Sequence, residues 1–273
     1  MPDLATTVRE LISDAAARLA DAGADTPRLD AELLLAHVLG VNRTRLVLDA
    51  FAVPDALVRD RFEALLARRG EREPVAYILG SRAFRHLSVT VDPRVLIPRP
   101  ETELLVEAAL ELPAGARVLD VGTGSGAVAL ALAQERPDLE VWGSDVSPDA
   151  LEVAVVNARR LGLAVRFVVA DLLGGLEGPF DAVVANLPYV QDGFDLPPDV
   201  AGFEPAGALF GGLDGLDVVR RLVATLDDVP WVALEIGAGQ APAVGALLTA
   251  AGFASVQARR DLAGIERVVV GCR

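Results

Sequence analysis

The sequence contains no lysine, so all 25 of its basic residues are arginines. It has one cysteine, Cys272, and only two histidines, His37 and His86. A single cysteine cannot form an internal disulfide, and these isolated side chains lack partners at metal-ligand spacing, so we expect no bound metal. The absence of lysine also excludes a Walker-type phosphate loop, which requires one.

Long apolar runs and a targeting segment are missing as well. Although 52% of the residues are hydrophobic, no uninterrupted apolar stretch approaches the roughly 18 residues of a membrane span. The first residues also lack a basic stretch followed by an apolar one, so no secretory signal is visible. These features predict a cytoplasmic protein that does not bind membranes.

The charge is strongly acidic, with a formal net value of −14 at pH 7. This excess argues against direct binding of nucleic acid, whose phosphates attract basic surfaces. The exception is residues 76–100, which carry four arginines against one acid. We interpret this small basic segment as a solvated face.

Residues 1–75 show the apolar periodicity of three amphipathic helices joined by short loops. The first predicted helix runs from about Leu4, with Asp3 as the candidate N-cap, to Gly23. The second runs from Thr26-Pro27 to Gly40. The third runs from about Pro54 to Arg69, and its apolar stripe consists of Leu57, Phe62, Leu65 and Leu66. The resulting bundle contains no cluster of catalytic residue types. We therefore predict a recognition domain.

A different pattern starts near residue 76. Apolar residues alternate from Ala83 to Val91, which predicts a β-hairpin within a linker of residues 76–100. Strand and helix patterns then alternate through residues 101–273, and two strands close the chain. This order predicts an α/β domain with a doubly wound, Rossmann-like sheet of seven strands, the last one antiparallel.

The most informative stretch is RVLDVGTGSGAVALAL, residues 117–132. It predicts a buried strand, a glycine loop and a helix, an arrangement that offers backbone N–H groups to a ligand. A dinucleotide fingerprint has the spacing G-x-G-x-x-G, whereas the glycines here stand at positions 122, 124 and 126. A glycine-rich turn without a ligand is the alternative interpretation.

Two acids follow the next predicted strands. Asp145 ends the strand at 140–145, where it can accept hydrogen bonds from both ribose hydroxyls of a nucleoside. The alternative is that Asp145 or Ser147 caps the helix after it, and Ser147 can cap while Asp145 binds. Asp171 follows the strand at 165–169 and can receive an adenine amino group, although acids are also common in loops.

The fourth predicted strand, residues 180–185, leads into Asn186-Leu187-Pro188-Tyr189. Because ligands bind at the carboxyl ends of parallel strands, this turn should lie at the same sheet edge as the glycine loop. The Asn186 Oδ1 atom and the Leu187 carbonyl can accept the two hydrogens of a planar –NH₂ group. Tyr189 can lie against that plane.

These motifs resemble signatures of known enzymes. Asp120 and the three glycines match the E/D-x-G-x-G-x-G pattern of class I S-adenosylmethionine-dependent methyltransferases. The turn resembles the N/D/S-P-P-Y/F/W signature of methyltransferases that act on planar nitrogens, with Leu187 where that signature has proline. The acceptor at this position is a backbone carbonyl, which any residue supplies, and Pro188 still favours extended geometry before it. We therefore expect function to be retained.

The similarity extends nearly end to end to the peptide-chain release factor glutamine N5-methyltransferases, the HemK/PrmC family. Its most specific part is the hairpin together with Val95-Leu96-Ile97-Pro98-Arg99-Pro100-Glu101-Thr102-Glu103. The other matching segments are residues 73–80, 120–126, 203–205, 208–212, 234–237 and 261–264.

This resemblance implies transfer of a methyl group from S-adenosylmethionine to the glutamine of the Gly-Gly-Gln loop in class I release factors, with S-adenosylhomocysteine as product. It implies that the cofactor is held by Gly122, Thr123, Gly124, Ser125, Gly126, Asp145, Asp171, Leu172 and Asn186. It assigns the substrate amide and the catalysis to Asn186, Leu187, Pro188 and Tyr189. Residues 101–273 would be the methyltransferase domain, residues 1–75 would recognise the release factor, and we expect a monomer.

Two rival hypotheses come from other classes. A methyltransferase of nucleic-acid amino groups shares the Asn-Pro-aromatic turn, but the net charge and the acid-rich helical domain count against it. A non-catalytic adaptor would bind release factors through residues 1–75 and use the cofactor only structurally. Cofactor turnover on a glutamine peptide separates an enzyme from an adaptor.

Overall fold

The computed structural model describes residues 6–273, and the chain within it divides into two compact units. The helical unit comprises residues up to Gly80 together with Leu196–Phe203. The sheet unit comprises Ser81–Asp195 and Glu204–Arg273. The segment Leu196–Phe203 thus belongs with the helices, although it follows the Asn-Leu-Pro-Tyr turn in the sequence.

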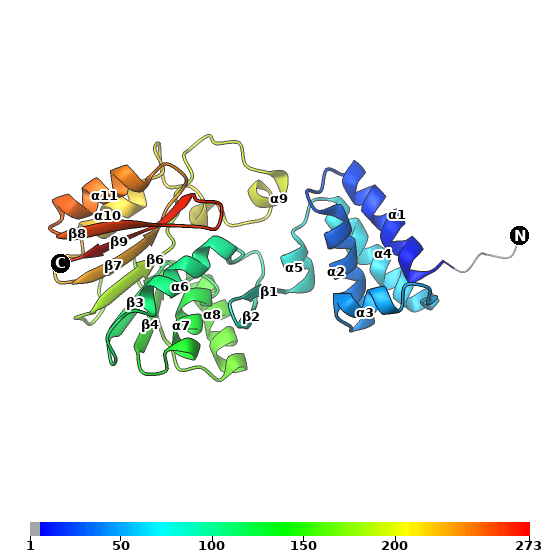
Figure 1. Cartoon of the computed structure of the whole chain (residues 1–273), viewed down its shortest axis with the longest axis horizontal. Helices are drawn as coiled ribbons and strands as arrows, with labels where there is room; N and C mark the ends of the chain where they lie inside the picture. The colour runs from blue at the N-terminus through cyan, green and yellow to red at the C-terminus, as the bar shows by residue number, and fades with distance from the viewer. Residues whose placement is uncertain (1–5) are drawn as a thin grey trace, which may run out of the picture. The chain divides into compact units, whose positions relative to one another are not determined.

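The helical unit contains the three predicted helices and three short ones (Figure 1). They are α1 (Val8–Asp21), α2 (Pro27–Leu39), α3 (Arg43–Leu48), α4 (Ala56–Gly70), α5 (Val75–Leu79) and α9 (Pro198–Ala201). The cap of α1 is Thr7, whose hydroxyl accepts from the Glu10 N–H in a capping box; Asp3 and Leu4 lie outside the described residues. Gly40 ends α2, as predicted, and it does so in the left-handed conformation that favours glycine.

A compact apolar core holds the helical unit together. It includes Ile12, Leu19, Leu34, Leu35, Phe62 and Leu66. The prediction for Leu57 is wrong, because its side chain is 58% exposed. Val58, one position along the first turn of α4, packs against the core instead, while Phe62, Leu65 and Leu66 face it as predicted.

A buried ion-pair network joins Leu196–Phe203 to the rest of this unit. Arg69 Nε donates to Asp30 at 2.7 Å, with both side chains nearly inaccessible to water. Arg72 donates to Asp199, in α9, at 3.1 Å. Because a buried charge without its partner is costly, these pairs fix the segment in place.

The sheet unit begins with the predicted hairpin, formed by β1 (Ser81–Phe84) and β2 (Leu87–Thr90). The main sheet then has seven strands, as predicted. They are β3 (Arg117–Val121), β4 (Glu140–Asp145), β5 (Arg166–Val169), β6 (Ala182–Ala185), β7 (Trp231–Glu235), β8 (Ser255–Arg260) and β9 (Glu266–Cys272).

The strand order is β5-β4-β3-β6-β7-β9-β8. The last strand, β9, is inserted antiparallel between β7 and β8, which confirms the predicted topology. Helices cover both faces of the sheet (Figure 1). One face is covered by α6 (Glu103–Ala109), α7 (Ala127–Glu135) and α8 (Pro148–Leu161). The other is covered by α10 (Asp217–Val223) and α11 (Ala241–Ala250). Short 3₁₀ turns, η1 (Pro100–Thr102) and η2 (Ala206–Ala208), complete the unit.

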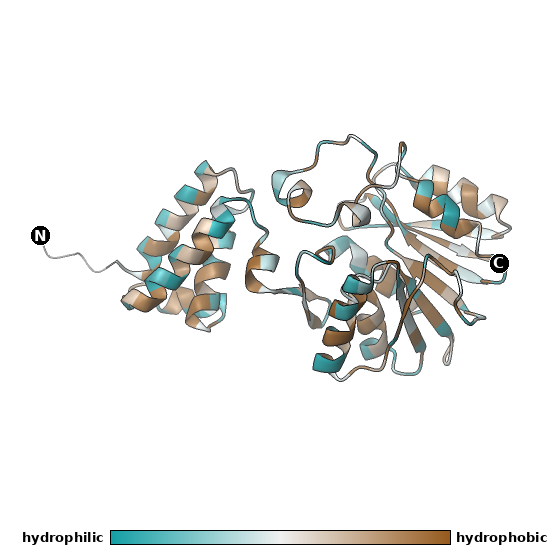
Figure 2. Ribbon diagram, turned by 180° about the vertical axis from the view of Figure 1, so that it is seen from behind, coloured by the Kyte–Doolittle hydropathy of each residue, from teal (hydrophilic) through white to brown (hydrophobic). Residues whose placement is uncertain are grey.

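One core of this unit lies between the sheet and α10 and α11. Its buried residues include Leu119, Val183, Val232, Val219, Leu222, Val244 and Leu248. Figure 2 shows the matching hydrophobic colouring of the central strands. Buried strands of this kind are apolar on both faces, as expected for a parallel sheet between helices.

The strand order reverses direction between β3 and β6, which are hydrogen-bonded neighbours. Val121 at the end of β3 lies opposite Ala185 at the end of β6. The loops that follow these strands therefore diverge from a shared crevice, where ligands of doubly wound sheets bind.

Candidate active site

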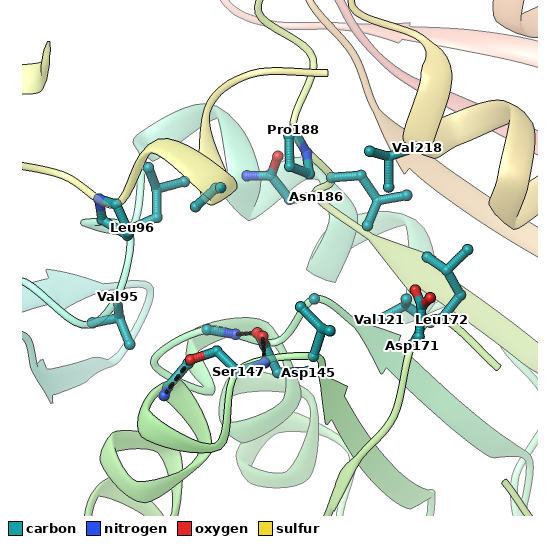
Figure 3. Close-up of a pocket in the computed structure, with 18 of the residues that line it drawn as sticks. Val95, Leu96, Val121, Asp145, Ser147, Asp171, Leu172, Asn186, Pro188 and Val218 are labelled. Atoms are coloured by element: carbon teal, nitrogen blue, oxygen red, sulfur yellow. Dashed lines mark hydrogen bonds between the residues drawn. The ribbon is translucent and has the colours of Figure 1, made fainter. Parts of the chain in front are cut away.

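A cavity of about 400 Å³ lies at the carboxyl ends of β3, β4, β5 and β6 (Figure 3). Its lining includes Gly122, Gly124, Asp145, Ser147, Asp171, Leu172, Asn186, Leu187 and Pro188. Small-molecule sites typically measure about 300–1,000 Å³. The topology therefore brings all four predicted segments to one cavity of suitable size.

The glycine loop approaches this cavity through its backbone. Gly122 and Gly124 have φ values of 71° and 54°, in the left-handed region that favours glycine. A Cβ atom on Gly122 would lie 3.3 Å from Leu187 Cδ2, so the two loops meet closely there. These two glycines line the cavity, whereas Thr123, Ser125 and Gly126 do not.

Thr123, Ser125 and Gly126 instead make contacts that hold the loop in place. The Thr123 hydroxyl donates to Asp120 at 2.6 Å, and Gly126 packs against α8, where an added Cβ would lie 3.2 Å from Ala154. The Ser125 carbonyl accepts from Asn157 Nδ2 at 2.9 Å. We therefore expect these residues to shape the loop rather than to contact a ligand with their side chains.

Asn157 is a residue that sequence reasoning missed. This buried side chain also donates to the Thr90 carbonyl and accepts from the Thr90 N–H, so it joins the hairpin to the glycine loop. An asparagine within an otherwise amphipathic helix gave no signal of that role.

Asp120 lies beneath the loop rather than in the cavity. Its carboxyl accepts hydrogen bonds from the Thr123 hydroxyl and from the Ala129 N–H at the start of α7. Burial raises the pKa of Asp120 to about 7, and the nearby Asp145 carboxylate adds to the rise. This acid therefore anchors the strand–loop–helix turn.

Asp145 faces the cavity (Figure 3) and is held by backbone groups. Its two oxygens accept from the Gly124 N–H and the Ser147 N–H, both at 2.9 Å. Ser147 caps α8 by accepting from the Ala150 N–H at 3.2 Å. Each carboxylate oxygen can accept a further hydrogen bond, so Asp145 can bind ribose hydroxyls while Ser147 acts as the cap.

Asp171 and Leu172 line the cavity next to Asp145 (Figure 3), because the end of β5 pairs with the end of β4. The exposed Asp171 carboxylate accepts from Arg221, in α10, at 2.6 Å. Leu172 is buried and has a positive φ of 57°, which turns the chain back toward the sheet. Arg221 also lines the cavity, and nothing in the sequence pattern indicated it.

The Asn-Leu-Pro-Tyr turn divides its side chains between the cavity and the interior. Asn186, Leu187 and Pro188 line the cavity, and Asn186 Nδ2 donates to Thr102 Oγ1 at 3.1 Å. The Leu187 side chain is only 5% exposed and packs into the main core. Tyr189 does not line the cavity; its hydroxyl donates to Glu235 at 3.4 Å.

Two segments far apart in the sequence close the cavity on its remaining side. The buried Glu204 carboxylate accepts from the Ile97 N–H at 3.1 Å and from Arg99 at 2.6 Å. These contacts place Pro205 and Ala208 beside Leu96 at the cavity. In the sequence, these two segments were marked only by their resemblance to the family, in residues 95–103, 203–205 and 208–212.

The turn is also braced by the stretch after η2. The Val190 N–H donates to the Leu209 carbonyl, and the Gly211 N–H donates back to the Val190 carbonyl. A Cβ on Gly211 would lie 2.3 Å from the Pro188 carbonyl oxygen, so only glycine fits. This contact explains the glycine in the segment 208–212.

The residues present fit S-adenosylmethionine. Asp145 retains acceptor capacity for ribose hydroxyls, the glycine loop admits a ligand close to its backbone, and Val146, Leu172 and Val218 supply apolar walls for a base. Within residues 6–273, no group of three or more His, Cys, Asp or Glu side chains could hold a metal ion. No helix in that range is long and apolar enough to cross a membrane.

Comparisons with known proteins agree with this assignment. Residues 10–80 match the family described as the PrmC N-terminal domain, and residues 100–200 match the methyltransferase small domain. Among solved structures, the catalytic domain of hMettl16 is 15% identical to the chain, with a TM-score of 0.60. That likeness covers 74% of this chain and 83% of the solved one, and it supports the fold alone.

The fold and the cavity together define a class I, S-adenosylmethionine-dependent methyltransferase. The release factor glutamine methyltransferase of Mycolicibacterium smegmatis is 45% identical over 98% of both chains. That of Burkholderia pseudomallei is 47% identical over 89% of this chain and 91% of its own. The chain belongs to the family of release factor glutamine methyltransferases.

Proposed function

We propose that this chain methylates the side-chain amide nitrogen, N5, of the glutamine in the Gly-Gly-Gln loop of class I release factors. The names of its relatives support the substrate. One structural observation supports the chemistry: the glycine loop, Asp145 and Asn186 line the same cavity. Methyl donor and amide acceptor can therefore be held face to face.

The cofactor supplies an electrophilic methyl group on its sulfonium. The acceptor amide is a weak nucleophile, because its lone pair is delocalised into the carbonyl. Asn186 Oδ1 and the Leu187 carbonyl can each accept one amide N–H, which keeps the nitrogen aimed into the cavity. Catalysis on this account is positioning together with fixed hydrogen bonds, and both are strong effects in a closed site.

Tyr189 supports the acceptor rather than acting as a base. Burial raises the pKa of Tyr189 to about 12, and the neighbouring Glu235 carboxylate contributes to the rise. The phenol is therefore protonated at neutral pH. Its hydroxyl is held by Glu235, so Tyr189 braces the turn from outside the cavity lining.

The helical unit, residues 1–75 in particular, would recognise the body of the release factor. Four large apolar side chains close together in its sequence are exposed: Val47, Leu48, Phe51 and Val53. Exposed apolar surface of this kind is typical of interaction sites. The enzyme would act as a cytoplasmic monomer that does not bind nucleic acid directly, consistent with its net charge of −14.

The deciding experiment is incubation of the protein with methyl-labelled S-adenosylmethionine and a purified release factor, followed by mapping of the labelled residue. We expect the label on the glutamine of the Gly-Gly-Gln loop. A release factor with alanine at that position is the matched control and should stay unlabelled. Label on another residue, or on bare RNA or DNA offered in place of the protein, would contradict the proposal.

The recognition role is tested by comparing two substrates. Phe51→Ala should lower kcat/KM on the whole release factor and leave kcat/KM on a short Gly-Gly-Gln peptide unchanged. Equal effects on both substrates would assign this surface a structural role, and no effect on either would show that Phe51 does not recognise the release factor.

A further inference from the structure

A buried polar cluster lies directly behind the Asn-Leu-Pro-Tyr turn. It consists of Thr102, at the end of η1, and Glu235, the last residue of β7, whose exposed fractions are 4% and 2%. Neither residue lines the cavity. Burial of a carboxyl is costly unless hydrogen bonds compensate it, so its position in the core needs an explanation.

Hydrogen bonds connect this cluster to two residues of the turn. Asn186 Nδ2 donates to Thr102 Oγ1 at 3.1 Å. The Thr102 hydroxyl lies close enough to the Glu235 carboxyl to lower its pKa. The Tyr189 hydroxyl donates to Glu235 Oε1 at 3.4 Å. The second carboxyl oxygen, Oε2, has no hydrogen-bond partner among the described residues.

The direction of these hydrogen bonds follows from the chemistry of an ionised carboxylate. A carboxylate only accepts, so the Thr102 hydroxyl must donate its single hydrogen to Glu235. The hydroxyl oxygen is then left to accept, and only the –NH₂ end of the Asn186 amide can donate to it. The Oδ1 end of Asn186 must therefore point away from Thr102.

We propose that Thr102 and Glu235 are positioning residues for methyl transfer: they fix the side-chain amide of Asn186 so that Oδ1 is presented to the substrate amide. This inference rests on the proposed function, in which Oδ1 accepts an N–H of the target glutamine. It also gives a role to the segment 97–103, which is specific to the family but contributes no reacting group.

The protonation state of Glu235 controls the direction of the chain of hydrogen bonds. Burial raises its pKa to about 7, while the Thr102 and Tyr189 hydroxyls oppose the rise. The charged groups that act on it are Glu101, which raises the pKa, and Arg267, which lowers it. A protonated Glu235 can donate to Thr102, whose hydroxyl could then donate to Asn186, and the fixed orientation of the amide is lost.

The glutamine substrate does not titrate near neutral pH, so a pH effect on the transfer step belongs to the enzyme. Asp120, the other acid with a pKa of about 7, lies under the glycine loop, where its titration would change cofactor affinity. Single-turnover rates at saturating cofactor separate the two groups. The wild-type rate should fall as pH drops through about 7.

The test compares Thr102→Val, which removes the hydroxyl at nearly constant shape, with Thr102→Ser, which keeps it. We expect Thr102→Val to lower the single-turnover rate on a release factor by about tenfold or more, as for loss of fixed geometry in a transition-state contact. Thr102→Ser should stay within about threefold of wild type. The cofactor dissociation constant, measured by calorimetry, should change by less than about twofold in both.

A second variant, Glu235→Gln, covers the case in which Thr102→Val does not fold. Its rate should be lower than that of the wild type at pH 8 and nearly independent of pH between 6 and 8. A wild-type-like pH profile in Glu235→Gln, or an unchanged rate in folded Thr102→Val, would overturn the inference.

One readout does not depend on activity. In ¹⁵N-labelled protein, exchange of the Asn186 side-chain NH₂ hydrogens should be slow in wild type and Thr102→Ser and fast in Thr102→Val. Fast exchange in wild type would contradict the inference even if methylation is normal. Absence of glutamine methylation by wild type, with slow exchange intact, would instead contradict the proposed function.

Discussion

The two sides of the cavity are built in different ways. On the donor side, defined by Gly122, Gly124 and Asp145, the carboxylate proposed to bind the cofactor is held by backbone N–H groups. On the acceptor side, defined by Asn186 and Leu187, the Asn186 amide proposed to bind the substrate is held by the Thr102 side chain, from a distant segment. Cofactor binding and the geometry of methyl transfer therefore depend on different residues. A single substitution can change cofactor affinity without changing the transfer rate, or the reverse.

The largest effect is expected on the acceptor side. Asn186→Ala removes one fixed hydrogen-bond acceptor of the transition state and should lower kcat by about 10²-fold or more. Single-turnover methylation of a release factor measures it. Gln257→Ala, which removes an exposed amide on the edge strand β8, is the matched control and should leave kcat unchanged. A near-normal rate in Asn186→Ala would rule out the amide contact.

Substitutions on the donor side should lower the affinity for S-adenosylmethionine. Asp145→Ala should weaken S-adenosylmethionine binding by about 1.5–3 kcal/mol, as for hydrogen bonds to a charged acceptor. Calorimetry checks this value. Asp171→Ala is the comparison variant and should cost less, because the Asp171 carboxylate is exposed and already paired with Arg221. Unchanged affinity in folded Asp145→Ala would remove that residue from the site.

A smaller effect is expected on the pH dependence of stability, and it comes from Asp120, which lies beneath the glycine loop on the donor side. The pKa of Asp120 is about 7 in the folded protein, above its ordinary value of 3.8, so the folded state holds a proton that the unfolded state releases. Stability should therefore fall as pH rises toward 7, by about 2 kcal/mol between pH 5 and 7.

Asp120→Asn keeps this position neutral and should reduce that slope. Urea unfolding followed by tryptophan fluorescence measures it, since both tryptophans, Trp142 and Trp231, lie in the main sheet. The dependence of stability on pH should not vanish in this variant, because burial also raises the pKa of Glu235, to about 7. An identical slope in Asp120→Asn and wild type would show that Asp120 does not titrate in this range.

The smallest effect is expected for Leu187→Pro. The residue contributes its carbonyl to the acceptor side, so the transfer rate should stay within about tenfold of wild type. The buried side chain packs in the main core, and its loss should reduce stability by about 1 kcal/mol. Single-turnover rates and thermal melts check both values. Abolished transfer in a stable protein would show that the Leu187 N–H is needed.

The contrast between the two sides also explains what the sequence could predict. The strand, glycine loop and helix at 117–132 are local in the sequence, so their pattern predicted both the elements and the cavity edge. The topology followed from alternating strands and helices, and β9 was correctly predicted to be antiparallel. These features depend on periodicity and turn chemistry.

Tertiary contacts between distant segments could not be predicted. The approach of Thr102 and Glu235 to Asn186 depends on how η1 and β7 meet in space, and neither residue stands out in its own segment. The same holds for Asp199, which follows the Asn-Leu-Pro-Tyr turn in sequence but pairs within the helical unit. Leu57 was misplaced because it adjoins Val58 in the first turn of α4, and only Val58 has the i, i+4, i+7, i+8 spacing to Phe62, Leu65 and Leu66.

The separation of the two sides is tested most directly by one paired measurement: cofactor affinity and single-turnover rate at saturating cofactor, both in Asp145→Ala and in Asn186→Ala. The account predicts that Asp145→Ala loses affinity and keeps a rate near wild type, whereas Asn186→Ala loses rate and keeps its affinity. Equal loss of both quantities in both variants would contradict it.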